Sequence, residues 1–406
     1  MKKVLVIGGG ASGMAAAIAA ARNGAGVEIL EHNRQLGKKI LSTGNGKCNY
    51  TNSRQGIRCY RGENPAFALP VFGQFGFAET VEFMKGLGIF PKERDGYFYP
   101  ASGQAVSVQE ALRMELRRLG VRVALERGVT KVRKRGGSFE ARAGRETWRA
   151  DRCIFACGGL AFAKSGSDGS AFSLIEELGH TFIEPVPALV QLKAKQDFFA
   201  SAAGVRTDGT VTLYVEGKQV CSDRGEIQLT ESGISGIPAF QVSRYAARAL
   251  SRREKVWAAL DFAPYLNEGE LYEELQFRFS KGRDKTAQEA LVGLFPQKLI
   301  LLFLKQNHIA LQKPAGEVSN KTLRMLCGFI KRAVVDITGT KGFDAAQATA
   351  GGVDTAELCP DTLESYLVPG LYFAGEVIDI DGMCGGYNLQ WAWSSGYVAG
   401  MHAALD

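Results

Sequence analysis

The first thirty residues alternate between apolar runs and segments rich in glycine or alanine. Lys3–Ile7 is a short apolar run, the pattern of a strand that is buried on both faces. Residues 12–23 are rich in alanine and predict a helix that ends at Gly24. Residues 27–30 predict a second strand, which runs into Glu31. This order of strand, glycine turn, helix and strand predicts a βαβ unit.

Glycine turns also divide a later stretch of the chain. Residues 104–119 predict a helix, and Gly120 follows it. Alternating short runs with glycine between them predict a β-meander over residues 121–125, 129–134, 138–142 and 146–150. Residues 152–156 then predict another buried strand, which leads into Gly158 and Gly159.

The pattern changes near Pro185 and Pro187. From there to about Gly342, strand signals are followed by amphipathic helices rich in Leu, Lys and Arg, which predicts an inserted domain. Residues 371–374 return to a buried strand, and a glycine loop and a helix over residues 388–404 follow. The two ends of the chain are therefore expected to belong to one α/β domain.

Composition narrows the class of protein. The 46% hydrophobic and 22% charged residues exclude a disordered chain, a collagen and a disulfide scaffold. The charge balance is 49 − 42 = +7, which suits an anionic ligand and makes a nucleic-acid partner unlikely on charge alone. Eight cysteines without a C-x-x-C pair, with only four histidines, argue against a metal site and favour free thiols in the cytoplasm. No apolar run approaches the ~18 residues of a membrane span.

A dinucleotide-binding signature lies at the first βα turn. Gly8 would allow the tight turn, Gly10 would let a pyrophosphate approach the backbone, and Gly13 would let helix and strand pack closely. The helix N-terminus would present free N–H groups to the phosphates. Glu31, at the end of the second strand, could accept both hydroxyls of an adenosine ribose and would repel a 2′-phosphate.

The carboxyl-terminal segment decides between FAD and NAD. Gly375 and Glu376 follow a predicted strand, Asp379 comes next, and Gly386, Tyr387 and Asn388 begin the closing helix. FAD-binding proteins of the two-dinucleotide-fold type need such a return segment. Its acid would reach the ribityl side, and the helix N-terminus would stabilise negative charge on the reduced flavin. Simple NAD dehydrogenases do not need it, so FAD is the predicted cofactor.

These segments together resemble the BaiN-like flavoprotein family, which includes aminoacetone oxidases and is often described as NAD(P)/FAD-dependent oxidoreductases. The resemblance runs nearly end to end. It includes GGGASGMAAA at the start, KKILSTGNGKCNYTN from residue 38, DGYFYPASGQAVSV from residue 95, ACGGLAFAKSGSDGSAF from residue 156, ATAGGV from residue 348 and GLYFAGEVIDIDGMCGGYNLQWAWSSG from residue 370.

The resemblance implies an α/β fold with a Rossmann-like FAD-binding domain of the two-dinucleotide-binding type, formed by residues 1–187 and 346–406. It also implies an insert, residues 188–345, with a β-barrel-like part at about 188–240 and 320–345 and a helical part at about 241–319. The implied FAD contacts are Ser12, Glu31, Lys39, Asn45, Cys48, Asn49, Gly375, Glu376, Asp379, Gly386, Tyr387 and Asn388. The full cofactor-binding set adds Gly8, Gly10, Ala11, Gly13, Val129 and Gly158.

The chain departs from the family pattern at three places. Lys47 stands where the family usually has Arg, which keeps the charge but loses the bidentate fork. The stretch of residues 96–100, Gly-Tyr-Phe-Tyr-Pro, lacks another Arg, and Ala161-Phe162-Ala163 replaces Ser-Tyr-Pro. If these positions face the substrate, the pocket is more apolar than is usual in the family.

The flavin would carry the hydride or electron transfer, while side chains position and tune it. Cys48 is a candidate nucleophile because a neighbouring cation, Lys47, could lower the pKa of its thiol. The alternative is that Cys48 is simply a small residue that packs near the flavin. Tyr97 is a further candidate, for the substrate pocket. Only one Gly-x-Gly-x-x-Gly begins a βαβ unit, so NAD(P)H would dock transiently at the flavin or the substrate would be the reductant.

Three functions remain open from the sequence. The first is an FAD-dependent oxidoreductase that acts on a small or steroid-like molecule, by reducing unsaturated bile-acid-type intermediates or by oxidising amines. The second is an RNA-modifying flavoprotein that uses the basic segment of residues 113–152, which has thirteen Lys or Arg and five Asp or Glu. The third is a flavin-loaded sensor without turnover. The substrate, the electron acceptor and the oligomeric state are not determined by the sequence.

Overall fold

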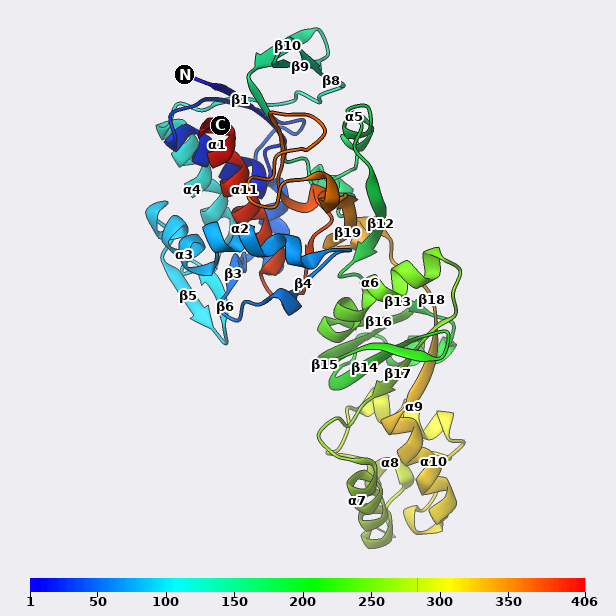
Figure 1. Ribbon diagram of the computed structural model, residues 1–406. Helices are drawn as coiled ribbons and strands as arrows, with labels where there is room; N and C mark the ends of the chain where they lie inside the picture. The colour runs from blue at the N-terminus through cyan, green and yellow to red at the C-terminus, as the bar shows by residue number, and fades with distance from the viewer. Residues whose placement is uncertain (283, 406) are drawn as a thin grey trace. The chain divides into compact units, whose positions relative to one another are not determined.

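A computed structural model describes residues 1–282 and 284–405 of the chain. It divides into two compact units, which are described separately below. The first combines both ends of the chain, Met1–Val186 and Gln347–Asp406, and the second is Pro187–Ala346 (Figure 1). Among the described residues, no helix has the length and apolar character that crossing a bilayer requires.

The first unit is built on a five-stranded parallel sheet. Its strands follow the order β20 (Leu371–Phe373), β11 (Arg152–Phe155), β1 (Lys3–Ile7), β2 (Gly26–Leu30) and β7 (Arg122–Ala124). Residues 4–7 of the central strand are buried, as expected for a strand covered by helices on both faces. The carboxyl-terminal strand β20 completes the sheet, so the predicted Rossmann-type FAD-binding fold is confirmed.

Helices from the two ends of the chain pack against each other over this sheet. Helix α1 (Ala11–Arg22) and helix α11 (Tyr387–Leu405), blue and red in Figure 1, touch along most of the length of α1. Two glycines of α11 allow this contact, because a Cβ on Gly396 would overlap the Ser12 carbonyl oxygen and one on Gly400 would overlap that of Ala16. The remaining helices of this unit are α2 (Ala68–Gln74), α3 (Phe77–Gly86), α4 (Ala105–Arg118) and α5 (Phe172–Glu176).

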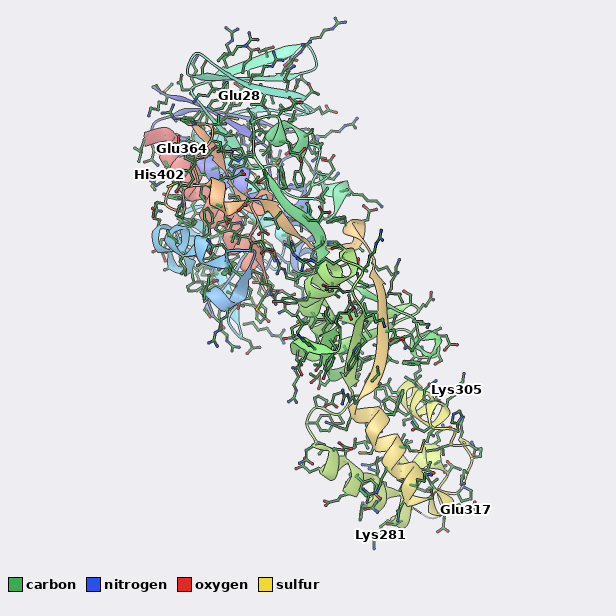
Figure 2. All side chains as sticks on the ribbon, turned by 45° about the vertical axis from the view of Figure 1, so that its right-hand side comes forward. Glu28, Lys281, Lys305, Glu317, Glu364 and His402 are labelled. Atoms are coloured by element: carbon green, nitrogen blue, oxygen red, sulfur yellow. The ribbon has the colours of Figure 1, made fainter. Side chains whose placement is uncertain are left out.

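The predicted four-stranded meander is wrong by one strand. Strand β7 joins the parallel sheet beside β2, because it follows helix α4 as a crossover connection and pairs Val123 with Ile29. The antiparallel sheet therefore has three strands, β8 (Lys131–Arg135), β9 (Ser138–Ala143) and β10 (Glu146–Ala150). Glu28, labelled in Figure 2, accepts a hydrogen bond from Trp148 Nε1 at 2.9 Å and forms an ion pair with Arg122 Nη2 at 2.8 Å.

Three smaller sheets complete the first unit. Strands β3 (Thr51–Asn52), β6 (Tyr97–Pro100) and β5 (Pro91–Arg94) form one, and β21 (Asp381–Gly382) with β4 (Tyr60–Arg61) forms another. The third pairs β12 (Phe182–Ala188) with β19 (Ala348–Val353). Because β21 and β19 come from the carboxyl-terminal part of the chain and their partners from the amino-terminal part, these sheets tie the two segments of the unit together.

The second unit contains a closed six-stranded barrel. Its strands follow the order β13 (Leu192–Ala194), β16 (Gly233–Gly236), β15 (Lys218–Thr230), β14 (Arg206–Val215), β17 (Val256–Asp261) and β18 (Ala333–Thr340). Helix α6 (Ile237–Ser251) packs against the barrel. The other helices are α7 (Glu268–Lys281), α8 (Ala287–Ala290), α9 (Gln297–Gln306) and α10 (Asn320–Lys331).

The predicted internal limits of this insert need correction at two places. Strand β17 lies within residues 241–319, which were assigned to the helical part, yet it pairs with β14 on one side and β18 on the other. Without it the barrel could not close. Helix α10 lies within residues 320–345, which were assigned to the barrel, because the last barrel strand begins only at Ala333.

A buried histidine links two loops of the first unit. His180 Nδ1 lies 2.7 Å from Glu357 Oε2, and His180 Nε2 lies 2.8 Å from Ser365 Oγ. Ser365 Oγ also accepts hydrogen bonds from the backbone N–H groups of Leu367 and Val368. Burial lowers the pKa of His180 and outweighs the raising effect of Glu357.

This histidine predicts a loss of stability on acidification. The folded state holds His180 neutral, so below the unfolded pKa of about 6.5 the unfolded state binds more protons and stability falls. We expect stability to fall as the pH is lowered through the unfolded pKa of about 6.5, measured as a falling melting temperature. A His180→Gln variant should flatten this dependence, whereas His308→Gln, at an exposed position, should not. An unchanged slope in His180→Gln would contradict the assignment.

Candidate functional site

A cavity of about 390 Å³ opens at the carboxyl ends of strands β1, β2 and β11. This edge of an open α/β sheet is where such folds bind ligands. Both ends of the chain form the wall, with residues 7–12 and 37–40 on the amino-terminal side and Glu376, Asn388 and Trp391 on the carboxyl-terminal side. The loop of residues 165–171 adds a further part of the wall. The cavity lies within the first unit.

The glycine turn after β1 brings backbone N–H groups to the cavity. Gly8 has φ +102°, and a Cβ on it would lie 2.5 Å from the Ala156 carbonyl oxygen. A Cβ on Gly13 would overlap the Gly8 carbonyl oxygen, so helix α1 can pack this closely on the strand only with glycine there. Gly10 is the N-cap of α1 and makes no side-chain capping bond, which leaves the first N–H groups of the helix open to an anion.

Glu31 is held rigidly at the end of β2. Its Oε2 accepts a hydrogen bond from the Gly9 N–H at 2.7 Å, and its Oε1 accepts from the backbone N and the Nδ2 of Asn33 at 2.8 Å each. The side chain is buried and lines the cavity. A carboxylate fixed beside the anion site is placed to receive the hydroxyl groups of a ribose.

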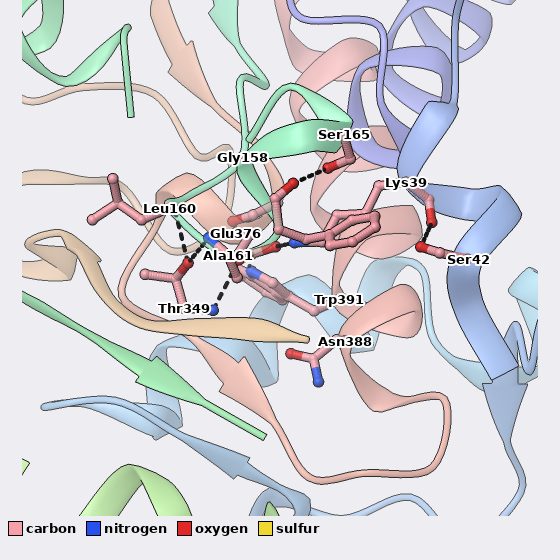
Figure 3. Close-up of polar contacts among 12 residues, drawn as sticks. Lys39, Ser42, Gly158, Leu160, Ala161, Ser165, Thr349, Glu376, Asn388 and Trp391 are labelled. Carbon is pink, nitrogen blue, oxygen red and sulfur yellow. Dashed lines mark hydrogen bonds and ion pairs between the residues drawn. The ribbon is translucent and has the colours of Figure 1, made fainter. Parts of the chain in front are cut away.

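An ion pair connects the two ends of the chain across the cavity wall. Lys39 Nζ lies 2.7 Å from Glu376 Oε2, and both residues line the cavity (Figure 3). Lys39 belongs to the 3₁₀ segment η1 (Lys38–Gly46), and Glu376 to η9 (Gly375–Val377). Glu376 Oε1 accepts a hydrogen bond from the backbone N of Thr349 at 2.9 Å.

These features fit a dinucleotide such as FAD. A Cβ on Gly10 would meet no atom of the described residues within 4 Å, so the backbone there is open to a ligand. Ser167 Oγ lines the same cavity and is buried, and within the described part of the chain it has no hydrogen-bond partner. A buried polar atom without a partner is costly, and a ligand hydroxyl or phosphate would satisfy it.

Comparison with known proteins decides the family. The family model described as the HI0933-like protein Rossmann domain matches residues 2–402. The chain belongs to the HI0933-like family. This membership confirms the predicted flavoprotein resemblance, and the chain is an FAD-dependent oxidoreductase.

Three curated relatives match almost the whole chain. A 3-dehydro-bile acid delta(4,6)-reductase of Clostridium scindens is 47% identical over 406 residues, which cover 100% of this chain and 99% of the relative. A ribosomal RNA dihydrouridine synthase of Haemophilus influenzae is 30% identical, with 98% of this chain and 97% of the relative covered. One of Escherichia coli is 28% identical, with 97% and 96% covered.

The structure brings only part of the predicted cofactor-binding set to the cavity. The members that line it are Gly8, Gly10, Ala11, Ser12, Glu31, Lys39, Val129, Gly158, Glu376 and Asn388. Others stand behind the wall. A Cβ on Gly375 would lie 2.5 Å from Ser12 Oγ, Asp379 Oδ2 accepts from the Glu63 N–H, and Tyr387 Oη donates to the Arg54 carbonyl. Gly375, Asp379 and Tyr387 of this HI0933-like chain are not part of the described cavity wall, so their predicted contacts with FAD stay a prediction.

The predicted flavin contacts in the loop of residues 43–49 stay a prediction. Asn45 and Lys47 are exposed, while Cys48 and Asn49 are buried. Asn49 Oδ1 has no hydrogen-bond partner among the described residues, and a Cβ on Gly386 would lie 2.9 Å from it. None of these four residues is part of the described cavity wall.

Cys48 lacks the environment of a reactive thiol. It is fully buried, and burial raises the pKa of the thiol to about 12 despite a hydrogen bond with Thr43. Burial also raises the pKa of Cys157 to about 12 and raises that of Cys153. A thiolate is therefore scarce at neutral pH, which favours the packing role over the nucleophile.

A Cys48→Ser variant is expected to keep FAD and to retain flavin reduction and turnover within about threefold of the native protein, because no thiolate takes part. The measurement is the rate of flavin bleaching by a reductant and the steady-state rate, with Cys359→Ser as the matched control at a partly exposed position. Loss of turnover in Cys48→Ser alone, with FAD still bound, would restore the nucleophile hypothesis.

Tyr97 lies against the turn before helix α11. A Cβ on Gly385 would lie 3.1 Å from Tyr97 Cε1 and 3.3 Å from Tyr387 Cε2. The sequence prediction of a substrate-pocket role for Tyr97 therefore stays a prediction, since the described cavity wall does not include it.

Sequence reasoning missed many residues of the site, and three of them make polar contacts or remain without a partner. Ser167 and Asn33 line the cavity, and Thr349 stands directly behind Glu376. The run of small residues after Gly158, SGSDGS at residues 165–170, was the available signal for Ser167. Thr349 lies in the ATAGGV segment that carries part of the family resemblance, but its role could not be inferred there because its partners are remote in the chain.

Proposed function

We propose that this HI0933-like protein reduces a carbon–carbon double bond conjugated to a ketone in a steroid-like substrate. The observation that carries the proposal is the 47% identity, over the whole chain, with a 3-dehydro-bile acid delta(4,6)-reductase. Two proteins with this identity over their whole length share the architecture of their sites. A ring ketone with conjugated double bonds can accept a hydride from reduced flavin.

The residues of this chain support an apolar substrate. Ala161, Phe162 and Ala163 follow Gly158 of the cavity wall and offer no side-chain hydroxyl. Phe162 has φ +60°, an uncommon conformation for a bulky residue, and its carbonyl accepts a hydrogen bond from Ser165 Oγ at 2.7 Å. A steroid nucleus presents mostly apolar surface, which such residues would favour. The described cavity wall does not include these three residues, so their part in a substrate pocket stays a prediction.

We propose NAD(P)H as the electron donor. Only one glycine-rich nucleotide-binding signature begins a βαβ unit in the sequence, and FAD would bind there. The sequence shows no second such unit for NAD(P)H. The nicotinamide would therefore dock transiently where the substrate later binds. FAD held by the turn of residues 8–13, Glu31 and the Lys39–Glu376 pair would supply hydride transfer between the nicotinamide and the substrate, and a proton taken up at the neighbouring carbon would complete the reduction.

The test is a two-step anaerobic experiment on the purified holoprotein. NADH or NADPH should bleach the visible flavin spectrum, and a 3-oxo-4,6-diene steroid should then restore it, with the saturated 3-oxo steroid as the control. A flavin that bleaches and is not reoxidised by the diene contradicts the reductase. Oxygen consumption with an amine substrate, and no reaction with the diene, would assign amine oxidation instead.

A second candidate function is the reduction of uridine in RNA. Two relatives at 30% and 28% identity are ribosomal RNA dihydrouridine synthases. Saturating a uracil ring also reduces a double bond conjugated to a carbonyl group. The three-stranded sheet β8–β10 exposes Arg133, Lys134, Arg135, Arg145 and Arg149, which suits a phosphate backbone.

This candidate predicts RNA binding that weakens steeply with salt. A steroid reductase without an RNA substrate should show no such binding. Incubation of uridine-containing ribosomal RNA with the reduced protein, followed by measurement of dihydrouridine, separates the two functions. Dihydrouridine formation that is faster than diene reduction would replace the steroid proposal.

A further inference from the structure

We propose that Thr349 is a positioning residue of the flavin site, which fixes the Lys39–Glu376 ion pair relative to the cavity wall. The proposal rests on FAD binding and not on the identity of the substrate. Thr349 stands in strand β19, and Figure 3 shows its side chain directed toward the loop that carries Leu160 and Ala161.

Thr349 joins three segments of the wall that are far apart in the sequence. Its Oγ1 accepts hydrogen bonds from the Leu160 N–H at 2.8 Å and the Ala161 N–H at 3.0 Å. Its own backbone N–H donates to Glu376 Oε1 at 2.9 Å. One residue thus holds both the loop after Gly158 and the carboxylate of η9.

The ion pair extends this link to a fourth segment. Glu376 Oε2 pairs with Lys39 Nζ at 2.7 Å, so each oxygen of the carboxylate has one fixed partner. The side chains of Lys39 and Glu376 keep 27% and 21% of their accessible surface and line the cavity. The place of the Lys39 cation beside a bound flavin nucleotide therefore depends on where Thr349 holds Glu376.

The packing around Thr349 leaves little freedom. Thr349 is only 1% exposed, and it stands behind the cavity wall rather than in it. A Cβ on Gly159 would overlap Thr349 Oγ1 and would lie 3.1 Å from Glu376 Oε1. The absence of a side chain at Gly159 lets the loop come close enough to bind the Thr349 hydroxyl. The contact therefore requires both Gly159 and Thr349.

Thr349→Val tests the proposal because it keeps the shape of the side chain and removes only the acceptor. The buried N–H group of Ala161 and the partly buried one of Leu160 then have no partner, and the loop must move away from β19. We expect the Kd for FAD of the flavin-free protein to rise by about tenfold or more. Thr349→Ser, which keeps the hydroxyl, should stay within about threefold. The measurement is quenching of flavin fluorescence on titration.

A coupling measurement separates positioning from general destabilisation. Lys39→Met should raise the Kd in the native background and should raise it less, by at least threefold, in the Thr349→Val background. Valine keeps the backbone N–H that binds Glu376, but the loop that moves also packs against Glu376 at Gly159, so its movement shifts the ion pair. Independent effects of the two substitutions on the Kd would overturn the proposal. If Thr349→Val does not fold, the same two measurements, the Kd for FAD and its coupling to Lys39→Met, are made with Thr349→Ala and with Gly159→Ala.

Ser365→Ala is the matched control. Ser365 is also buried and its Oγ also accepts two backbone N–H groups, those of Leu367 and Val368, but it does not line the cavity. Its loss should lower the melting temperature and leave the Kd for FAD unchanged. A native Kd in Thr349→Val, or an equal rise in Kd in Ser365→Ala, would overturn the assignment.

Discussion

Gly10→Val is expected to fold like the native chain and to bind FAD at least about 100-fold more weakly. A Cβ at Gly10 would meet no described atom within 4 Å, and its φ of −75° is accessible to valine, so the fold itself tolerates the side chain. The space that the valine would occupy is the cavity at the N-terminus of helix α1. The side chain would keep a pyrophosphate from the helix N–H groups.

The measurements are the Kd for FAD and the melting temperature of the flavin-free protein. Valine is a poor N-cap residue, so a loss of up to about 1 kcal/mol, or about 2–4 °C, is expected without FAD. Gly13→Val is the contrasting variant, because its side chain would overlap the Gly8 carbonyl oxygen and should prevent folding of the first unit. Native FAD affinity in Gly10→Val would show that the nucleotide does not approach this turn.

Gly400→Ala is expected to destabilise the first unit by about 3 kcal/mol. The added methyl group would overlap the Ala16 carbonyl oxygen and lie 2.7 Å from its carbon, both of them backbone atoms of helix α1. Backbone atoms cannot swing aside as a flexible side chain can, so helix α11 must move away from α1. Because these helices bring the two ends of the chain together behind the cavity, FAD retention should fall as well.

Gly73→Ala is the matched control for this substitution. Gly73 lies within helix α2 of the same unit, and a Cβ there would meet no described atom within 4 Å. It should be neutral or stabilising by about 0.5–1 kcal/mol, since alanine is the better helix former. Chemical denaturation of the two variants measures the difference. Equal stabilities would mean that α1 and α11 do not pack as closely as the structure has them.

The sequence predicted the parts of the fold that depend on local pattern. The apolar run Lys3–Ile7, the three glycines of the turn and Glu31 lie within one βαβ unit, so their spacing alone indicates a nucleotide-binding edge. The strand–glycine–acid order around Glu376 likewise pointed to FAD. Strand β7 was misassigned because an edge strand reads the same in sequence whether its partner is parallel or antiparallel.

The sequence by itself determined that both ends of this chain build one FAD-binding fold, because steric rules for glycine, helix starts and buried strands act over a few residues. Only the tertiary structure decided which candidates reach the cavity, that Cys48 is buried with a raised pKa, and that Ser167 and Thr349 belong to the site. Burial and hydrogen-bond partners come from residues distant in the chain: Thr349 meets Leu160 across 189 positions, and no local pattern encodes that contact.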